Sequence, residues 1–124
     1  MITILKWSGK AVTENRRLDG RFHANANYKA FLEHMIWIFK VQAAGIRYNY
    51  PDILMCVSVN SRVDHHNLHK PILDAIERSG LVDNDKNVGW VRMAPPERHP
   101  QGQDDEITVI LTGETVKKQK QAKQ

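Results

Sequence analysis

Apolar residues recur at intervals of three and four between Tyr28 and Phe39, which is the spacing of one face of an α-helix. Asn25 or Asn27 can cap the start of this helix, and Gly45 follows its last turn as a stop signal. Apolar residues at 36–38 (Ile-Trp-Ile) widen the apolar face. We therefore expect the helix to be covered on more than one side, with a dimer contact as one way to cover it. The repeat consists of Tyr28, Phe31, Leu32, Met35 and Phe39, with Gln42 one step further.

Four segments have the composition of strands. Residues 2–7 alternate apolar and polar side chains and end at Ser8-Gly9, which predicts a half-buried strand. Residues 53–59 are apolar without clean alternation, which predicts a central strand covered on both faces, with Cys56 as a buried, inert thiol. Residues 88–93 and 107–111 flank a connection that contains Pro and Gly, and we expect these two strands to form a hairpin.

A second helix is predicted to begin at Leu68, with Asn67 as its N-cap, and to end at Ser79-Gly80. At 124 residues, with 41% hydrophobic and 26% charged residues, the composition is that of one soluble globular domain. The expected fold class is α+β, a small mixed β-sheet flanked by two main helices. Residues 1–116 are expected to form this domain, and residues 117–124 a basic, mobile tail.

Basic residues are unevenly distributed along the chain. Residues 1–50 hold eight basic and three acidic side chains, whereas residues 51–124 hold ten basic and eleven acidic ones. This imbalance favours an anionic partner such as DNA. The predicted phosphate contacts are Lys10, Arg16, Arg17 and Arg21, and Phe22 beside them is predicted to stack on an unpaired base. One cysteine, no leader pattern and no long apolar run predict a cytoplasmic protein without a membrane contact.

Polar residues gather where the predicted strand 53–59 meets the second helix. Asp64 and His66 follow the strand, and Lys70 lies one helical turn beyond His66. In an extended segment Asp64 and His66 project to one side and His65 to the other. Divalent cations take carboxylate ligands and activate water, while a lysine stabilises charge on a phosphate, so the pattern favours phosphodiester cleavage. The alternative is a solvated helix cap followed, at Asp83 and Asp85, by an acidic turn.

The same residues resemble the signature of the RusA family of Holliday-junction resolvases. That family has an Asp-x-Asp-Asn-x-x-Lys core, then a helix containing Asp, a Gly, and an acidic pair before an apolar residue. The matching stretch is Asp64-His65-His66-Asn67-Leu68-His69-Lys70, followed by Asp74, Gly80, Asp83-Asn84-Asp85 and Val88, with weaker similarity at Trp7, Asn15-Arg16 and Tyr28.

The resemblance implies a small α+β homodimer that binds four-way DNA junctions. With Mg²⁺ or Mn²⁺ it would nick paired strands in DNA recombination and repair. Such proteins occur in bacteria and phages, so the implied location is a bacterial or phage-infected cytoplasm. By matching positions, Asp64 and Asp85 would bind the metal, Lys70 would be the catalytic lysine, and Asn15 would belong to the DNA-binding loop.

His66 departs from this pattern, because it stands where the family has its second core aspartate. An imidazole in place of a carboxylate weakens Mg²⁺ binding and favours Mn²⁺ or a later transition metal. His66 would then ligate a softer ion, or act as a base while Asp83 supplies another carboxylate, or mark a degenerate site that binds junctions without cutting them. A zinc site built on His65, His66 and His69 is a more distant alternative.

Overall fold

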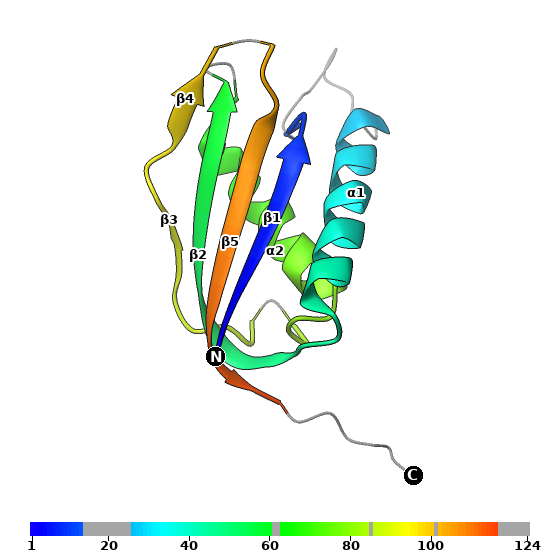
Figure 1. Cartoon of the computed structure of the whole chain (residues 1–124), viewed down its shortest axis with the longest axis vertical. Coiled ribbons are helices and arrows are strands. Elements are labelled where there is room, and N and C mark those ends of the chain that lie inside the picture. The colour runs from blue at the N-terminus through cyan, green and yellow to red at the C-terminus, as the bar shows by residue number, and fades with distance from the viewer. Residues whose placement is uncertain (14–25, 61–62, 85, 101, 117–124) are drawn as a thin grey trace.

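A five-stranded mixed sheet and two α-helices make up the fold (Figure 1). The structure, a computed structural model, describes residues 1–13, 26–60, 63–84, 86–100 and 102–116. Helices α1 (Ala26–Ala43) and α2 (His69–Arg78) lie against the same face of the sheet. The predicted α+β class, with a small mixed sheet and two main helices, is thereby confirmed. None of the helices in the described ranges is long and apolar enough to span a membrane.

Strand β2 (Tyr48–Asn60) is the centre of the sheet. β5 (Asp105–Thr115) pairs antiparallel with one side of β2, while β3 (Val91–Met93) and β4 (Glu97–His99) pair parallel with the other. The predicted hairpin between the last two strand segments is therefore wrong. Because β3 runs parallel to β2, the chain crosses the end of β2 before it returns as β5 (Figure 1).

Only one face of β2 is covered by helices. Ile53, Met55, Val57 and Val59 are buried, whereas the residues between them are partly exposed. The expectation that both faces are covered is wrong, since α1 and α2 both pack on the same side. Cys56 points to the open side and is partly exposed rather than buried.

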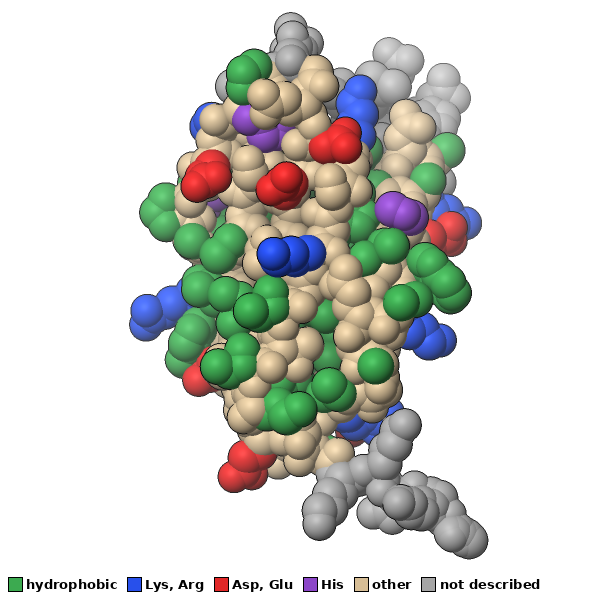
Figure 2. Space-filling model, in the orientation of Figure 1, with side chains coloured by type: hydrophobic (Ala, Val, Ile, Leu, Met, Phe, Trp, Pro, Cys, Tyr) green, Lys and Arg blue, Asp and Glu red, His purple; other side chains and the backbone are tan. Residues whose placement is uncertain are grey.

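The open face of the sheet carries a row of aliphatic side chains. Ile4 of β1 (Ile2–Gly9) is in register with Ile110 of β5, and Ile110 is in register with Leu54 of β2. Figure 2 shows apolar side chains over the lower part of this face and charged ones above them. Sheet formation alone aligns this row, because alternate residues of each strand project to the same side.

Helix α1 follows its predicted pattern and buries Phe31, Leu32, Met35 and Phe39 against the sheet and α2. It ends where predicted, with left-handed backbone at Ala44 (φ 52°) and Gly45 (φ 83°). Trp37 is 61% exposed, however, so no second surface of the described chain covers that side of the helix.

Gln42 of α1 occupies the free edge of strand β1. Its Oε1 accepts a hydrogen bond from the Lys6 N–H at 2.7 Å, and its Nε2 donates to the Lys6 carbonyl at 2.8 Å. The side chain thus imitates a neighbouring strand at one residue. An exposed edge would otherwise present unpaired backbone groups to other chains.

The segment before α2 is helical rather than extended. Residues His65–Leu68 form a short 3₁₀ helix, η1, and Leu68 stands at the N-cap position of α2 without a side-chain cap bond. The prediction of Asn67 as the N-cap is therefore wrong, because the helical turn has already begun at His65. The predicted end of α2 at Ser79-Gly80 is confirmed, with Gly80 at φ 91°.

Candidate metal centre

Asp64 begins the candidate centre and has a structural role of its own. Its backbone is extended (φ −80°, ψ 105°), and its Oδ1 accepts a hydrogen bond from the His66 N–H at 3.1 Å. It therefore caps η1, as short polar side chains do at helix starts. This bond uses one lone pair of Oδ1, which leaves Oδ2 of the exposed carboxylate for a cation.

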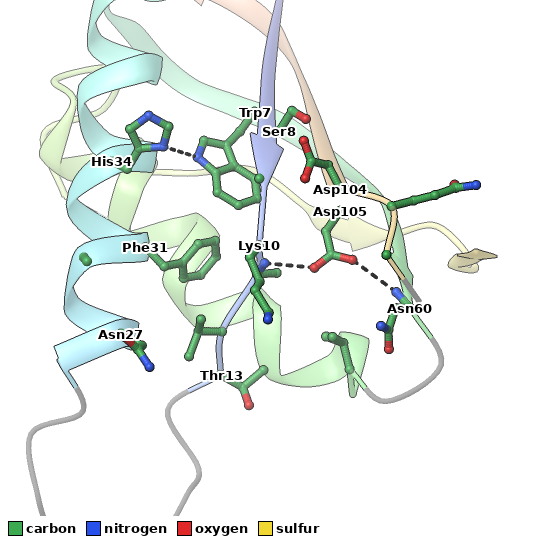
Figure 3. A pocket seen from close by; sticks show the side chains of 17 residues that line it. Trp7, Ser8, Lys10, Thr13, Asn27, Phe31, His34, Asn60, Asp104 and Asp105 are labelled. Carbon is green, nitrogen blue, oxygen red and sulfur yellow. Dashed lines mark hydrogen bonds between the residues drawn. The ribbon is translucent and has the colours of Figure 1, made fainter. Parts of the chain in front are cut away.

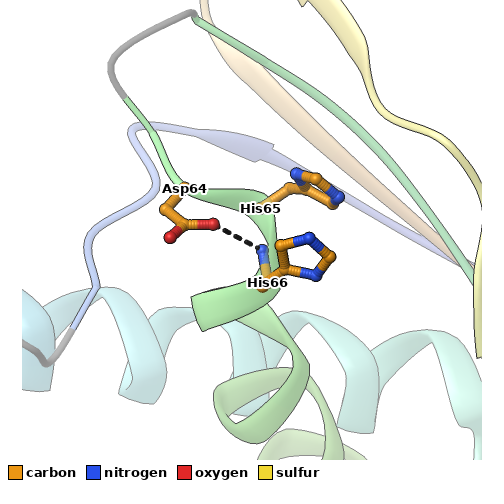
Figure 4. A group of neighbouring side chains, drawn as sticks. All are labelled: Asp64, His65 and His66. Atoms are coloured by element: carbon orange, nitrogen blue, oxygen red, sulfur yellow. Dashed lines mark hydrogen bonds between the residues drawn. The ribbon is translucent and has the colours of Figure 1, made fainter.

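His65 and His66 lie side by side at the start of η1, with ring centroids 4.0 Å apart and an angle of 36° between the rings (Figure 4). The prediction that His65 points away from His66 is wrong, because that alternation holds for an extended chain and residues 65–68 are helical. One ligand atom from each of Asp64, His65 and His66 lies within 4.8 Å of the other two. His69 is not part of this cluster.

The three ligand atoms are close to what one cation requires. Metal–nitrogen and metal–oxygen bonds of roughly 2.1 Å place two ligands of one ion at most about 4.2 Å apart. A small rotation of the side chains would bring the three ligand atoms into that range.

Partial burial, the neighbouring His66 and the Arg98 guanidinium lower the pKa of His65, while Asp64 acts in the opposite direction. The low pKa favours the neutral ring, which is the form that binds metals.

The donor set decides which ions suit the cluster. One carboxylate and two imidazoles match Mn²⁺ and the later transition metals, whereas Mg²⁺ prefers oxygen ligands alone. The residues present therefore fit Mn²⁺ better than Mg²⁺.

Arg98 of β4 contacts the cluster, although no pattern in the sequence singles it out. Its Nη1 donates to the carbonyls of Asn60 (3.1 Å) and Val63 (2.7 Å), and its Nη2 lies 3.4 Å from Nδ1 of His65. Arg98 reaches His65 because β4 pairs with the end of β2, with Arg98 opposite Val59. No local pattern signals this, since residues 95–102 read as a Pro- and Gly-containing connection.

Lys70 lies one helical turn beyond His66, as predicted from the sequence. It is exposed, occupies the second position of α2 and follows His66 by four residues, one helical turn. Asp74 follows Lys70 at the same interval, on the same side of α2.

Asp83 does not join the cluster. Its Oδ1 forms a 2.8 Å ion pair with Nη1 of Arg47, and Arg47 precedes the first residue of β2, whereas Asp64 follows the last one. The 13 residues of β2 span roughly 40 Å, so these carboxylates lie at opposite ends of the sheet. Asp83 therefore does not supply a further carboxylate to the cluster in this structure, because η1, α2 and the residues after them carry the chain back from the end of β2 to its start.

Several predicted site residues lie outside the described residues. These are Asp85, Asn15, Arg16, Arg17, Arg21 and Phe22. Of the predicted DNA contacts, Lys10 is described, and it is exposed just beyond the end of β1.

A cavity of about 1200 Å³ opens beside the cluster, between the end of β1, the first half of α1 and the start of β5 (Figure 3). Lys10, Phe31 and His34 line it, together with Val63, the residue before Asp64. Trp7 closes its inner wall and donates from Nε1 to Nδ1 of His34 at 2.9 Å. The cavity thus has the exposed, basic Lys10 in its lining, and the candidate cation ligands follow directly after Val63, another lining residue.

The buried Asp105 holds the strand ends around this cavity. Its Oδ2 accepts from the Ala11 N–H at 2.9 Å, and its Oδ1 accepts from the Asn60 N–H at 3.1 Å and contacts Nε2 of His99 at 2.9 Å. One carboxylate therefore ties together the ends of β1, β2 and β4. Sequence reasoning missed this role, because no local pattern reveals a contact between strand ends that are far apart in the chain.

Comparison with known proteins does not place the chain in a family. No protein-family model matches it, and no curated protein does. Among solved structures it is similar to a 2C-methyl-D-erythritol-2,4-cyclodiphosphate synthase determined in a CDP-bound form, with 9% identity and a TM-score of 0.37. That match covers 90% of this chain and 99% of the other. A TM-score this low supports neither a shared fold nor a shared activity.

The expected membership of the RusA family is corrected by these comparisons, since no family model, that of the RusA family included, matches the chain. The geometry points the same way, because Asp83 lies far from Asp64. Asp64, His66 and Lys70 must therefore be judged on their own arrangement.

Proposed function

We propose that this protein is a metal-dependent endodeoxyribonuclease that cuts branched DNA, with four-way junctions as its substrate in recombination and repair. The observation that carries the proposal is the cluster of Asp64, His65 and His66, of which His65 is half-buried and the other two are exposed. Their ligand atoms lie within 4.8 Å of one another, one helical turn before Lys70. A cation held beside a lysine suits phosphodiester hydrolysis, in which negative charge accumulates on the phosphate.

Each residue has a separate part in this proposal. Asp64 and His66 hold the cation, and His65 completes the ligand set. When bound, the cation supplies Lewis-acid activation of water and of the phosphate. Lys70 stabilises the charge that develops on the phosphate oxygens. Mn²⁺ is the proposed cofactor, because two imidazoles and one carboxylate suit it better than they suit Mg²⁺.

Charge supports DNA as the substrate. The first 50 residues hold eight basic side chains against three acidic ones, and Lys10 lies at the cavity next to the cluster. A DNA strand drawn to this end of the sheet would place a phosphate near Asp64. Affinity of this kind falls steeply as salt rises.

A homodimer is part of the proposal. Trp37 and Val41 are 61% and 58% exposed and lie one turn apart on α1, so they form an apolar patch that a second copy can cover. Two copies related by a two-fold axis would place two cutting sites on a four-way junction, which has similar symmetry.

The test compares a labelled four-way junction with a matching linear duplex at low salt, with Mg²⁺ or Mn²⁺. We expect symmetric nicks in the junction alone, stronger with Mn²⁺, and loss of nicking in Asp64→Asn and Lys70→Met. Asp83→Asn is the matched control, since it removes a carboxylate at the other end of β2, and it should cut like the wild type. Nicking of both DNAs alike would overturn the junction preference, and no nicking with any cation would overturn the nuclease.

A second candidate is a protein that binds branched DNA without cutting it. It is favoured by the single carboxylate in the cluster, since Asp83 is remote. In the same assay it would retard the junction in a gel without nicks, and His66→Asp, which restores a second carboxylate, would then introduce cleavage with Mg²⁺.

A further inference from the structure

Arg98 is held in place rather than being a free surface charge. Its Nη1 bridges two backbone carbonyls, of Asn60 and Val63, so the guanidinium stands over the turn that leads into the cluster. Its second nitrogen, Nη2, then lies 3.4 Å from Nδ1 of His65. An arginine bound by several acceptors loses little further entropy when it contacts one more group.

The contact fixes the state of the His65 ring. A guanidinium is a donor only, so Nδ1 of His65 must present its lone pair to Arg98. In the neutral ring the proton is then on Nε2. Both nitrogens of His65 are therefore unsuited to a cation while Arg98 is in place: Nδ1 is occupied by Arg98, and Nε2 carries the proton.

Binding a cation through either nitrogen requires Arg98 to leave. A cation on Nδ1 takes the lone pair that Arg98 uses. A cation on Nε2 forces the proton onto Nδ1, which would turn an N–H toward the N–H of Arg98. The positive charge of the guanidinium also opposes the charge of the cation.

We propose that Arg98 competes with the cation for His65 and thereby sets the affinity of the metal centre. The inference rests on the proposed function only through its metal centre, and it concerns cation binding rather than DNA cleavage. It assigns Arg98 as a positioning residue that acts through His65, and it favours cations that bind imidazole strongly enough to displace a guanidinium.

The experiment titrates Mn²⁺ into full-length, tag-free protein without DNA and follows free Mn²⁺ by its paramagnetic resonance signal. Arg98→Gln should bind Mn²⁺ about fivefold more tightly than the wild type, because it removes both the donor that occupies Nδ1 of His65 and one nearby positive charge. Arg98→Lys loses the contacts to the two carbonyls but keeps the charge, so it should gain less than Arg98→Gln, about twofold. Arg92→Gln is the charge-matched control, because it removes the same charge away from the cluster. Arg92 stacks on Trp90 at 5.0 Å and lies opposite the middle of β2.

A double variant tests whether Arg98 acts through His65. In a His65→Asn background, Arg98→Gln should change the affinity by less than it does when His65 is present, because only the effect of the charge remains. The inference is wrong if Arg98→Gln binds no more tightly than the wild type, if Arg98→Lys gains as much as Arg98→Gln, or if the gain is as large without His65 as with it. Absence of Mn²⁺ binding in every variant would overturn the metal centre itself, whereas binding without DNA cleavage would overturn only the nuclease.

Discussion

His99 and Asp105 form a nearly enclosed ion pair, with Nε2 of His99 2.9 Å from Oδ1 of Asp105 and side-chain exposures of 9% and 7%. The other ring nitrogen, Nδ1, lies 2.9 Å from the carbonyl oxygen of Pro100. A carbonyl and an ionised carboxylate only accept hydrogen bonds, so both ring nitrogens must donate. The arrangement therefore favours the doubly protonated imidazolium of His99.

The pH dependence of this pair follows from the pKa of His99. Its hydrogen bond to the Pro100 carbonyl raises the pKa, and the hydrogen bond and charge of Asp105 raise it further, against an opposing effect of burial. A raised folded-state pKa gives stability that is complete below the unfolded value of about 6.5 and is lost as pH rises through the folded value. We expect the difference in unfolding free energy between the wild type and His99→Gln to be larger at acidic than at alkaline pH. Urea unfolding of both proteins across this range measures it, and a difference that grows with pH would contradict the assignment.

Replacing the carboxylate of Asp105 should destabilise the fold. Asp105→Asn keeps the size of the side chain but turns an amide N–H toward one of three donors, which are the Ala11 N–H, the Asn60 N–H and the His99 ring. The expected loss of unfolding free energy is about 3 kcal/mol. Asp104→Asn is the matched control, since Asp104 is exposed one residue away. Equal stability of the two variants would show that Asp105 does not hold the strand ends.

Removing the Gln42 side chain from the free edge of β1 should have two effects. Gln42→Ala deletes both bonds to Lys6, which should cost about 1 kcal/mol because both groups are exposed to water. It also frees one N–H and one carbonyl on β1, so we expect association that increases with protein concentration. Light scattering at several concentrations checks this, with Lys40→Ala as a control on the same helix. If the molecular mass and the unfolding free energy are both unchanged, Gln42 neither stabilises the fold nor protects the edge of β1 from association.

The proposed dimer makes a prediction about α1. Trp37→Glu places a charge in the exposed patch with Val41 and should convert the protein to monomers in sedimentation equilibrium. Trp90→Glu is the control, because Trp90 is also exposed (46%) but lies before β3, away from α1. A wild type that is monomeric at high concentration would contradict the dimer.

Residue periodicity was sufficient to predict the two α-helices and the strands β1, β2 and β5. The three- and four-residue repeat of α1 and its stop at Gly45 are local properties, as are the alternation of β1 and the end of α2 at Gly80. Periodicity failed where a segment has no repeat long enough to decide its conformation. Residues 64–68 read equally well as extended chain or as a helical turn, and that choice determined where His65 points.

Local sequence patterns predicted two helices, a half-buried strand and a central strand, because hydrophobic spacing and glycine stops act between near neighbours in the chain. Three features follow from the folded domain instead: β2 separates the last strands, Asp83 lies at the far end of the sheet from Asp64, and Asp105 joins three strand ends. The fold also brings Arg98 to His65, 33 residues apart in the chain. Such contacts depend on the order and direction of strands, which arise from burial summed over the whole domain rather than from any local pattern.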